Sequence, residues 1–512
     1  MTAKSLVSYL TDILNTRVYD VARETPLDHA RLLSKRLENH VWLKREDQQS
    51  VFCYKIRGAY NKMMSLSAQQ LAKGVVVASA GNHAIGVAMS AHKLGTKAVI
   101  IMPLTTPAVK VEAVERWGAD VRLVGDNFDA AYQFASRLAD KERRTMIHPF
   151  DDPAIIAGQG TVGLEILKQS HVPIDAVFLP VGGGGLIAGV ATYIKQVRPE
   201  VKIIGVEPEE ADAMYRSLKA GRRVKLREVG IFADGVAVKQ VGKETFRLCR
   251  QTVDQVIRVN TDEICAAIKD TFEDTRTLVE PSGALAVAGI KRWLQAAEES
   301  SSPVSGKHLV AVSSGANVNF DRLRHISERA EIGERREAIL AVTIPEKPGS
   351  FRRFCASLGH REVSEFNYRY STGESAHIFV GVQIKDPDDI PKLVSRLESK
   401  GFPTLDLTDN EMAKIHARHM VGGRASGIAD EKIYSFEFPE RIGALKNFLD
   451  QLGTDFNITL FHYRNHGADY GRVLCGIRVP QSERKVLNGL LKNLGYRFKE
   501  ETDNPVYKLF LA

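Results

Sequence analysis

The segment AVFLPVGGGGLIAGVATYI (residues 176–194) places four glycines between two apolar runs. The first run, 177–181, has the length and composition of a buried parallel strand, and 186–194 predicts a helix. A glycine loop between a strand and a helix leaves backbone N–H groups free to surround an anion, and the helix N-terminus adds the positive end of its dipole. The segment therefore predicts an α/β protein with a phosphate site at residues 182–185.

The phosphate could belong to more than one ligand. The loop is not a P-loop, because no Lys-Ser or Lys-Thr pair follows the glycines. Gly183, Gly185 and Ala188 fit the G-x-G-x-x-A pattern of a dinucleotide site, and Glu207 ends the next apolar run where a ribose-binding acid belongs. The loop could instead hold the single phosphate of a cofactor such as pyridoxal phosphate, or be a flexible turn. Four glycines cost backbone entropy on folding, which disfavours a mere turn.

Composition predicts an ordinary soluble globular protein. The chain has 512 residues, 44% of them hydrophobic and 26% charged, and a net charge of +8. No apolar run is long enough to cross a membrane, and charges interrupt the apolar N-terminus, so we expect a cytoplasmic protein without a signal peptide. The five cysteines lack metal-ligand spacing, and we expect no metal. Basic and acidic residues are interspersed, so no nucleic-acid partner is expected.

Residues from about 40 to 320 alternate short apolar segments with amphipathic ones. This alternation predicts parallel sheets covered by helices on both faces. We place the end of the α/β part in the charged stretch 321–337. The expected strands are 74–79, 97–103, 120–125, 176–181, 202–208 and 308–315, and the expected helices include 83–94 and 127–142.

An internal repeat follows this part. LAVTIPEKPGSFRRFCASLG (340–359) aligns with YSFEFPERIGALKNFLDQLG (434–453), including a Pro-x-x-x-Gly turn at the same place. EFNYR (365–369) then matches LFHYR (460–464) with one residue inserted. The repeat is too long for a solenoid and predicts two copies of a small α+β domain. Because it lacks a catalytic cluster, we expect a binding role, with a structural or oligomerisation module as the alternative.

Lys55 is the first candidate for chemistry outside the glycine loop. It lies in WLKREDQQSVFCYKIRGAYN (42–61), which fits neither a clean strand nor a clean helix. A lysine in apolar surroundings has a lowered pKa, and its neutral amine can form a Schiff base. The alternative is a side chain that only extends toward solvent.

Two further segments follow predicted strands. ASAGNHAIGVA (78–88) forms a turn whose N–H groups suit a carboxylate, although the turn could simply be capped by Asn82. SSGANVN (313–319) offers a serine hydroxyl to a cleft, since α/β folds bind ligands at the carboxyl ends of parallel strands. Glu280, in VEPSGA, adds a polar group beside small residues.

Together these motifs resemble the threonine dehydratase (threonine ammonia-lyase) family, within the tryptophan-synthase-β-like, fold type II group of pyridoxal phosphate enzymes. The resemblance covers almost the whole chain. It implies a catalytic domain at 1–330, with a small subdomain inserted at roughly 48–150, and two ACT-like regulatory domains at 331–425 and 426–512. The motifs that carry it, in chain order, are KREDQQ, YKIRGAY, SAGNHAIGVA, PVGGGGLIAG, EPSGALA and SSGANVNF.

The resemblance also implies a role for each motif. Lys55 would bind pyridoxal phosphate covalently and act as the catalytic base, and Asn82 would bond its 3′-oxygen. The glycine loop would hold the phosphate, and Ser314 would face the pyridine nitrogen. The SAGNH turn would receive the substrate carboxylate. The implied contacts are Lys55, Ser79, Ala80, Gly81, Asn82, His83, Gly182, Gly183, Gly184, Gly185, Leu186 and Ser314.

The implied reaction is α,β-elimination from L-threonine, and also L-serine, to a 2-oxo acid and ammonia. For threonine the product is 2-oxobutanoate, the first committed step of isoleucine biosynthesis. The resemblance further implies a homotetramer, inhibited by isoleucine and relieved by valine. Cys53-Tyr54 replaces the usual Ser-Phe, and we expect cofactor binding to survive because Cys and Tyr keep bulk and some hydrogen bonding. Ile85 replaces a Gln and removes an amide near the substrate, so the resemblance does not fix the fine substrate preference.

Three rival functions stay open at this point. One is a pure amino-acid sensor with an inactive catalytic half, which the intact Lys55 and glycine loop disfavour. A serine racemase would need an acid–base group on the second face of Cα, where this chain has Ala80. An NAD-dependent oxidoreductase would use the glycine loop with Glu207, but it leaves Lys55 and the asparagine turn without a role.

Overall fold

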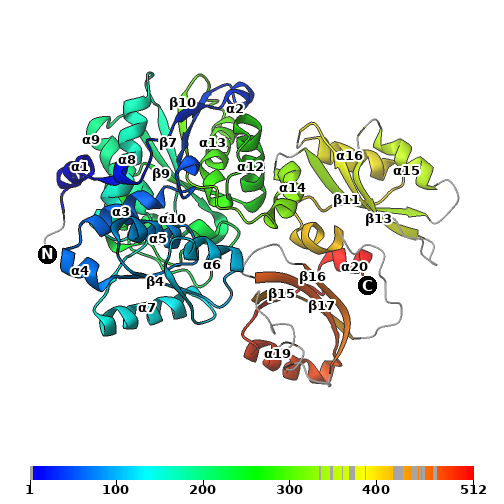
Figure 1. Cartoon of the computed structure of the whole chain (residues 1–512). Coiled ribbons are helices and arrows are strands. Elements are labelled where there is room, and N and C mark those ends of the chain that lie inside the picture. The colour runs from blue at the N-terminus through cyan, green and yellow to red at the C-terminus, as the bar shows by residue number, and fades with distance from the viewer. Residues whose placement is uncertain are drawn as a thin grey trace. The chain divides into compact units, whose positions relative to one another are not determined.

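The computed structural model describes residues 4–333, 336–345, 350–359, 361, 363–367, 375–386, 388–418, 430–439, 448, 451, 456–464 and 470–511. The chain forms two compact units, Met1–Ile326 and Ser327–Ala512 (Figure 1). The change from one unit to the other falls inside the charged stretch 321–337.

The first unit contains a six-stranded sheet with the order β1-β2-β10-β7-β8-β9. Its elements are β1 (Leu27–His29), β2 (His40–Arg45), β7 (Ala176–Pro180), β8 (Lys202–Pro208), β9 (Gln255–Val259) and β10 (His308–Ser313), with α8 (Pro153–Gln169), α9 (Gly185–Val197) and α13 (Pro281–Glu299) packed against it. Strand β1 is antiparallel to β2, and the other neighbours are parallel. Val177 and Leu179 pack with α8 and α9, whereas Phe178 lies against Trp293 of α13. Helices cover both faces, which explains the continuous apolar strands.

A smaller, all-parallel sheet has the order β5-β4-β3-β6. Its elements are β3 (Val75–Ala78), β4 (Ala98–Met102), β5 (Asp120–Leu123) and β6 (Thr145–Met146), with α3 (Lys55–Met64), α5 (Asn82–Leu94), α6 (Ala108–Glu115) and α7 (Phe128–Glu142). Val75 and Val77 pack with α3 and α5, and Val76 and Ala78 pack with α7. The predicted α/β fold with two parallel-sheet subdomains is confirmed.

The expected strands and helices are present with their ends shifted by at most three residues. The interpretation of 42–61 as neither strand nor helix is wrong: β2 occupies its start, and α3 begins at Lys55. The apolar pattern failed there because α3 turns Arg57 inward. The remaining helices of this part of the chain are α1 (Leu6–Leu14), α2 (Arg31–Arg36), α4 (Ala68–Lys73), α10 (Ala213–Ala220), α11 (Lys243–Thr252), α12 (Thr261–Thr275) and α14 (Arg322–Gly333).

Arg57 belongs to a buried cluster of four charged side chains. Its guanidinium donates to Glu46 and Glu165, and Lys44 pairs with Glu165 at 2.6 Å. All four side chains are 0% exposed. Two positive and two negative charges balance within the cluster, as burial of charge requires. The cluster anchors α3 two residues after Lys55.

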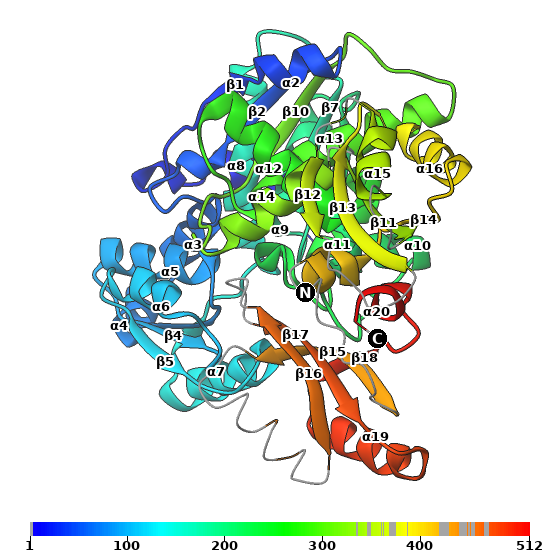
Figure 2. The same cartoon turned by 90° about the vertical axis from the view of Figure 1, so that its right-hand side faces the viewer.

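The second unit contains two antiparallel sheets of matching order, β12-β13-β11-β14 and β16-β17-β15-β18. The strands are β11 (Glu337–Pro345), β12 (Val363–Asn367), β13 (Ser375–Gln383), β14 (Thr404–Asp406), β15 (Glu431–Pro439), β16 (Asn457–Arg464), β17 (Tyr470–Arg478) and β18 (Arg497–Glu500). Helices α15 (Ser350–Leu358) and α16 (Asp389–Ser399) lie on one face of the first sheet, and α19 (Arg484–Asn493) lies on one face of the second (Figure 2). The pairing shifts register at the same place in β12 and β16.

The repeat predicted from the sequence is therefore present as two α+β modules. The predicted boundary at 425/426 and the turn glycines Gly349 and Gly443 lie outside the described residues. The modules share a core in which Ile339 and Phe379 of one sheet join Ile433 and Leu474 of the other, together with the π-helical turn η5 (Ala413–Ala417) and α20 (Pro505–Phe510). Among the described residues, no helix is long and apolar enough to span a membrane.

Candidate active site

The predicted site residues lie at loop and helix ends beside the carboxyl ends of the parallel strands. Lys55 is the first residue of α3, and Asn82 is the first residue of α5. The glycine loop joins β7 to α9, and Ser314 directly follows β10. Lys55, Asn82 and Ser314 thus come from three distant parts of the sequence.

Backbone contacts join these segments around the 313–319 motif. Cys53 forms an isolated antiparallel bridge with Gly315, and the N–H of Tyr54 donates to the carbonyl of Ser314 at 3.3 Å. The N–H of Glu280 donates to the carbonyl of Gly315 at 3.1 Å. The lysine motif, the 280–286 motif and the serine motif therefore meet.

The Lys55 amine points to a short 3-10 turn, η4 (Asp234–Val236). Its Nζ donates to the carbonyl oxygen of Gly235 at 3.1 Å. A Cβ on Gly235 would lie 2.6 Å from Ser282 Oγ and 3.4 Å from Glu280 Oε1. The amine therefore lies beside a turn that Ser282 and Glu280 also border.

The glycine loop has the geometry of a tight cradle. A Cβ on Gly183 would lie 2.2 Å from the Phe150 ring, and one on Gly182 would lie 2.8 Å from the Cα of Val236. Gly184 has φ +95°, a conformation that favours glycine. The loop therefore presents backbone rather than side chains, at the N-terminus of a 13-residue helix. This arrangement fits the phosphate of pyridoxal phosphate.

Buried hydroxyl groups near Ser314 also fit a polar cofactor. Ser314 Oγ donates to the carbonyl of Ser282 at 3.2 Å. Within the described part of the chain, the Oγ atoms of Ser282 and Ser313 are buried without a hydrogen-bond partner. Buried hydroxyls are rarely left unpaired, so these groups are consistent with a ligand that bears polar atoms.

The turn before α5 places backbone N–H groups beside the same site. Gly81 is the N-cap and Asn82 the first helical residue, so Asn82 is not the cap. The side chain of His83 is buried with Nε2 3.3 Å from the carbonyl of Ile147, and burial lowers its pKa to about 3. The imidazole is therefore neutral and packed, and only the backbone of this residue is suited to a carboxylate.

Glu280 is the buried acid of the site. Burial raises its pKa to about 7, and the charge of Asp234 adds to the rise. Lys55 and the hydrogen bond from Asn82 oppose this shift only in part. A buried carboxyl group whose pKa lies near 7 is a feature of functional sites.

Sequence reasoning missed several residues that border the site. Lys110 of α6 donates to Asp234 at 2.6 Å and so links the small subdomain to η4. Phe150 packs on the glycine loop. No local motif marks Lys110, Phe150 or Asp234 in the sequence. Asn317 contacts Asn82, and its place in the SSGANVN motif was the available signal.

The two departures from the family pattern are buried or partly buried. Cys53 is 1% exposed, and burial raises the pKa of its thiol. Ile85 packs against the apolar cluster that contains Val51 and Ile56. These residues therefore fill space beside the site, and Ile85 adds no polar group.

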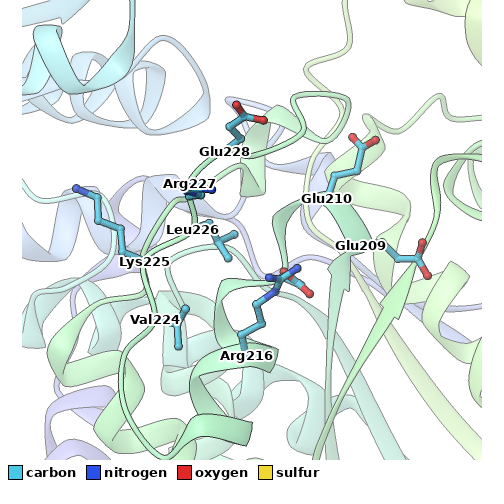
Figure 3. Close-up of a pocket in the computed structure, with 9 residues that line it drawn as sticks. Glu209, Glu210, Arg216, Val224, Lys225, Leu226, Arg227 and Glu228 are labelled. Carbon is cyan, nitrogen blue, oxygen red and sulfur yellow. The ribbon is translucent and has the colours of Figure 1, made fainter. Parts of the chain in front are cut away.

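A separate surface hollow follows β8 in the sequence, lined by Val224, Leu226 and seven charged residues between Glu209 and Glu228 (Figure 3). Arg216 of α10 faces it, with Glu209 and Glu210 nearby. None of the predicted site residues lines this hollow. It is therefore distinct from the site around Lys55.

Comparison with known proteins decides the family. Residues 18–315 match the family of pyridoxal-phosphate-dependent enzymes, and residues 328–417 and 422–511 each match the C-terminal regulatory domain of threonine dehydratase. The chain is 56% identical over 507 residues to the biosynthetic L-threonine dehydratase of Burkholderia multivorans, covering 98% of this chain and 99% of that protein. The chain belongs to the biosynthetic threonine dehydratase family. Its predicted family and dependence on pyridoxal phosphate are confirmed.

Solved structures are similar to the chain over less than two thirds of its length. The processed threonine deaminase isoform 2 of Solanum lycopersicum is 50% identical with a TM-score of 0.62, over 64% of this chain and 88% of that chain. Maize serine racemase is 32% identical with a TM-score of 0.58, over 62% of this chain and 95% of that one.

The dinucleotide alternative fails on both sequence and structure. Glu207 is fully buried and accepts hydrogen bonds from the N–H groups of Met214 at 2.8 Å and Tyr215 at 2.7 Å. It therefore binds the first turn of α10 and is not presented to a ribose.

Proposed function

We propose that the chain converts L-threonine to 2-oxobutanoate and ammonia by α,β-elimination, and accepts L-serine as a second substrate. The observation that carries this proposal is the convergence of the Lys55 amine, the glycine loop and the Ser314 hydroxyl in a member of this family. The proposed step is the first committed one of isoleucine biosynthesis.

The binding roles follow from the chemistry of each group. The N–H groups of Gly182, Gly183, Gly184, Gly185 and Leu186 and the dipole of α9 would hold the cofactor phosphate. Asn82 would donate to the 3′-oxygen, and Ser314 would face the ring nitrogen. The turn formed by Ser79, Ala80, Gly81, Asn82 and His83 would bind the substrate carboxylate through its backbone.

Lys55 carries the proton transfer in this proposal. When bound, pyridoxal phosphate supplies an electron sink for the bond that breaks at Cα. The Nζ of Lys55 would remove the Cα proton as general base. A neutral Ser314 hydroxyl stabilises a charged ring less than a carboxylate would, which favours prompt loss of the β-hydroxyl group.

Racemisation is the rival chemistry at the same site. It needs a proton donor on the face of Cα opposite Lys55, and the turn has Ala80 at the matching position. Ala80 cannot transfer a proton, which supports elimination. Formation of D-serine from L-serine at a rate comparable to ketoacid formation would overturn this choice.

The C-terminal modules are proposed to be regulatory. We propose a catalytic domain at 1–330 and ACT-like domains at 331–425 and 426–512, with isoleucine as inhibitor and valine as its antagonist. The matches of 328–417 and 422–511 to the family's regulatory domain support this division. Inhibition requires that isoleucine bind two conformations with different affinity. We also propose a homotetramer, and the cytoplasmic location stays a prediction.

One experiment tests the regulatory part. Ketoacid formation from threonine is measured with and without isoleucine, in the full chain and in a chain lacking residues 338–512. We expect isoleucine to inhibit the full chain and to leave the truncated chain unaffected. Equal inhibition of both chains would refute a regulatory role for the modules.

A further inference from the structure

The side-chain amide of Asn82 is held from both ends. Its Nδ2 donates to Glu280 Oε1 at 2.6 Å, and its Oδ1 accepts from Asn317 Nδ2 at 2.8 Å. Asn82 is 7% exposed and Glu280 is 5% exposed, so water does not compete freely for these bonds. Glu280 is the N-cap of α13 and Asn317 lies in the segment after β10, so the two partners hold the amide from different elements.

The direction of these hydrogen bonds is fixed by a backbone group. Asn317 Nδ2 also donates to the carbonyl of Val51 at 2.9 Å. A carbonyl can only accept, so Asn317 must turn its nitrogen toward Val51 and toward Asn82. Asn82 must then face Asn317 with its oxygen and Glu280 with its nitrogen. The reversed amide would set two donors against each other and an oxygen against a carboxylate.

The fixed orientation leaves one donor unused. An amide nitrogen carries two hydrogens, and Glu280 takes only one from Asn82. We propose that Glu280 and Asn317 are positioning residues that set the orientation of the Asn82 amide, so that its second N–H is presented to the cofactor's 3′-oxygen. This inference rests on the proposed function, because the amide orientation matters to the reaction only if the cofactor ring lies against Asn82.

The place of Glu280 in the site supports this role. A Cβ on Gly315 would lie 2.7 Å from Glu280 Oε1, so the carboxylate is confined by backbone next to the serine motif. The backbone N–H of Glu280 also donates to the Gly315 carbonyl. The acceptor for Asn82 is therefore held rigidly, and Lys55 and Asp234 are the charged groups that act on it most strongly.

The experiment compares three variants of the full chain loaded with pyridoxal phosphate. Asn317→Asp replaces the donor that faces Asn82 by an acceptor, and Glu280→Leu removes the acceptor on the other side. Asn82→Ala removes the amide itself. For each protein, the visible absorbance of the bound cofactor and its dissociation constant are measured at pH 8, above the pKa of about 7 of Glu280.

All three variants should lose visible absorbance in favour of the near-ultraviolet band, because the 3′-oxygen loses its hydrogen-bond donor. The dissociation constant should rise roughly 10- to 100-fold, the loss of one hydrogen bond to a charged group. Glu280→Gln keeps an acceptor oxygen and should restore the wild-type spectrum.

Asn39→Asp is the matched control. Asn39 is 3% exposed, and its Nδ2 also donates to two carbonyls, of Leu37 and Val304. It lies at the opposite end of β2 and β10, so the same change should leave the spectrum of the cofactor unaltered.

The outcomes separate the inference from the proposed function. A spectral change in Asn82→Ala, with wild-type spectra in both Asn317→Asp and Glu280→Leu, would overturn the positioning role alone. An Asn82→Ala protein with the wild-type spectrum would overturn the contact to the 3′-oxygen, and the positioning role with it. If Asn317→Asp does not fold, Glu280→Leu and its Gln counterpart decide the question.

Discussion

Replacing Gly183 by alanine tests the glycine loop as the phosphate site. The added methyl group would lie 2.2 Å from both Cγ and Cδ1 of Phe150, far inside van der Waals contact. The ring cannot turn away easily, because it packs edge-on against His148 at 4.7 Å between centroids. The loop must therefore shift away from its binding geometry.

The size of the effect follows from overpacking. Extra methyl groups in well-packed sites cost about 1–3 kcal/mol. If that strain falls on the bound state of the loop, the dissociation constant of pyridoxal phosphate rises about 5- to 150-fold. The assay is titration of the cofactor-free protein with pyridoxal phosphate, followed by absorbance.

Two further proteins make this test specific. Gly489→Ala adds a methyl group where no atom lies within 4 Å and should leave cofactor affinity unchanged. Phe150→Ala combined with Gly183→Ala should bind more tightly than the sum of the single changes predicts, since the clash is gone. Wild-type affinity in Gly183→Ala would refute the phosphate cradle, and strict additivity in the double variant would refute the clash with the ring.

Two other predictions concern stability and pH. Arg57→Met leaves the carboxylates of Glu46 and Glu165 buried with one fewer cation, so it should lower the free energy of unfolding by about 3–5 kcal/mol. The control Arg122→Met, at the surface, should change the free energy of unfolding by less than about 1 kcal/mol. Urea denaturation measures both, and equal effects would contradict the buried cluster. The raised pKa of Glu280, about 7 against 4.5 in the unfolded chain, means that the folded protein keeps a proton that the unfolded chain releases. Between pH 4.5 and pH 7, the free energy of unfolding of the cofactor-free protein should therefore fall by up to about 3 kcal/mol more in the wild type than in Glu280→Gln. Parallel curves of unfolding free energy against pH for the two proteins would contradict this prediction.

Much of the fold was predictable because apolar segments alternate with amphipathic ones in both sheets of the first unit. Strand β7 is buried and apolar throughout, and the segments after β3, β7 and β10 contain glycine or serine. The repeat was visible because two copies share the same turn and the same strand order. Patterning failed at α3, where Arg57 is buried and its partners Glu46 and Glu165, which lie outside the helix, make that burial possible.

The site was predictable to the extent that its residues lie in local motifs. Lys55, Asn82 and Ser314 each lie in such a motif. The contacts that organise the site join residues far apart in the sequence. Asn317 contacts Asn82 across 235 residues, and Lys110 contacts Asp234 across 124 residues. Such pairings depend on the packing of two sheets and have no local sequence signature.

The most direct test of the proposed function is the role of the Lys55 amine in threonine turnover. Formation of 2-oxobutanoate from L-threonine is measured for the full chain with pyridoxal phosphate, for Lys55→Ala and for Lys62→Ala. Lys62 lies on the same helix but pairs with Asp152. We predict that the wild type and Lys62→Ala form the ketoacid and that Lys55→Ala forms none. Product formation by Lys55→Ala at the wild-type rate, or none by the wild type, would contradict the assignment of Lys55 as the catalytic base.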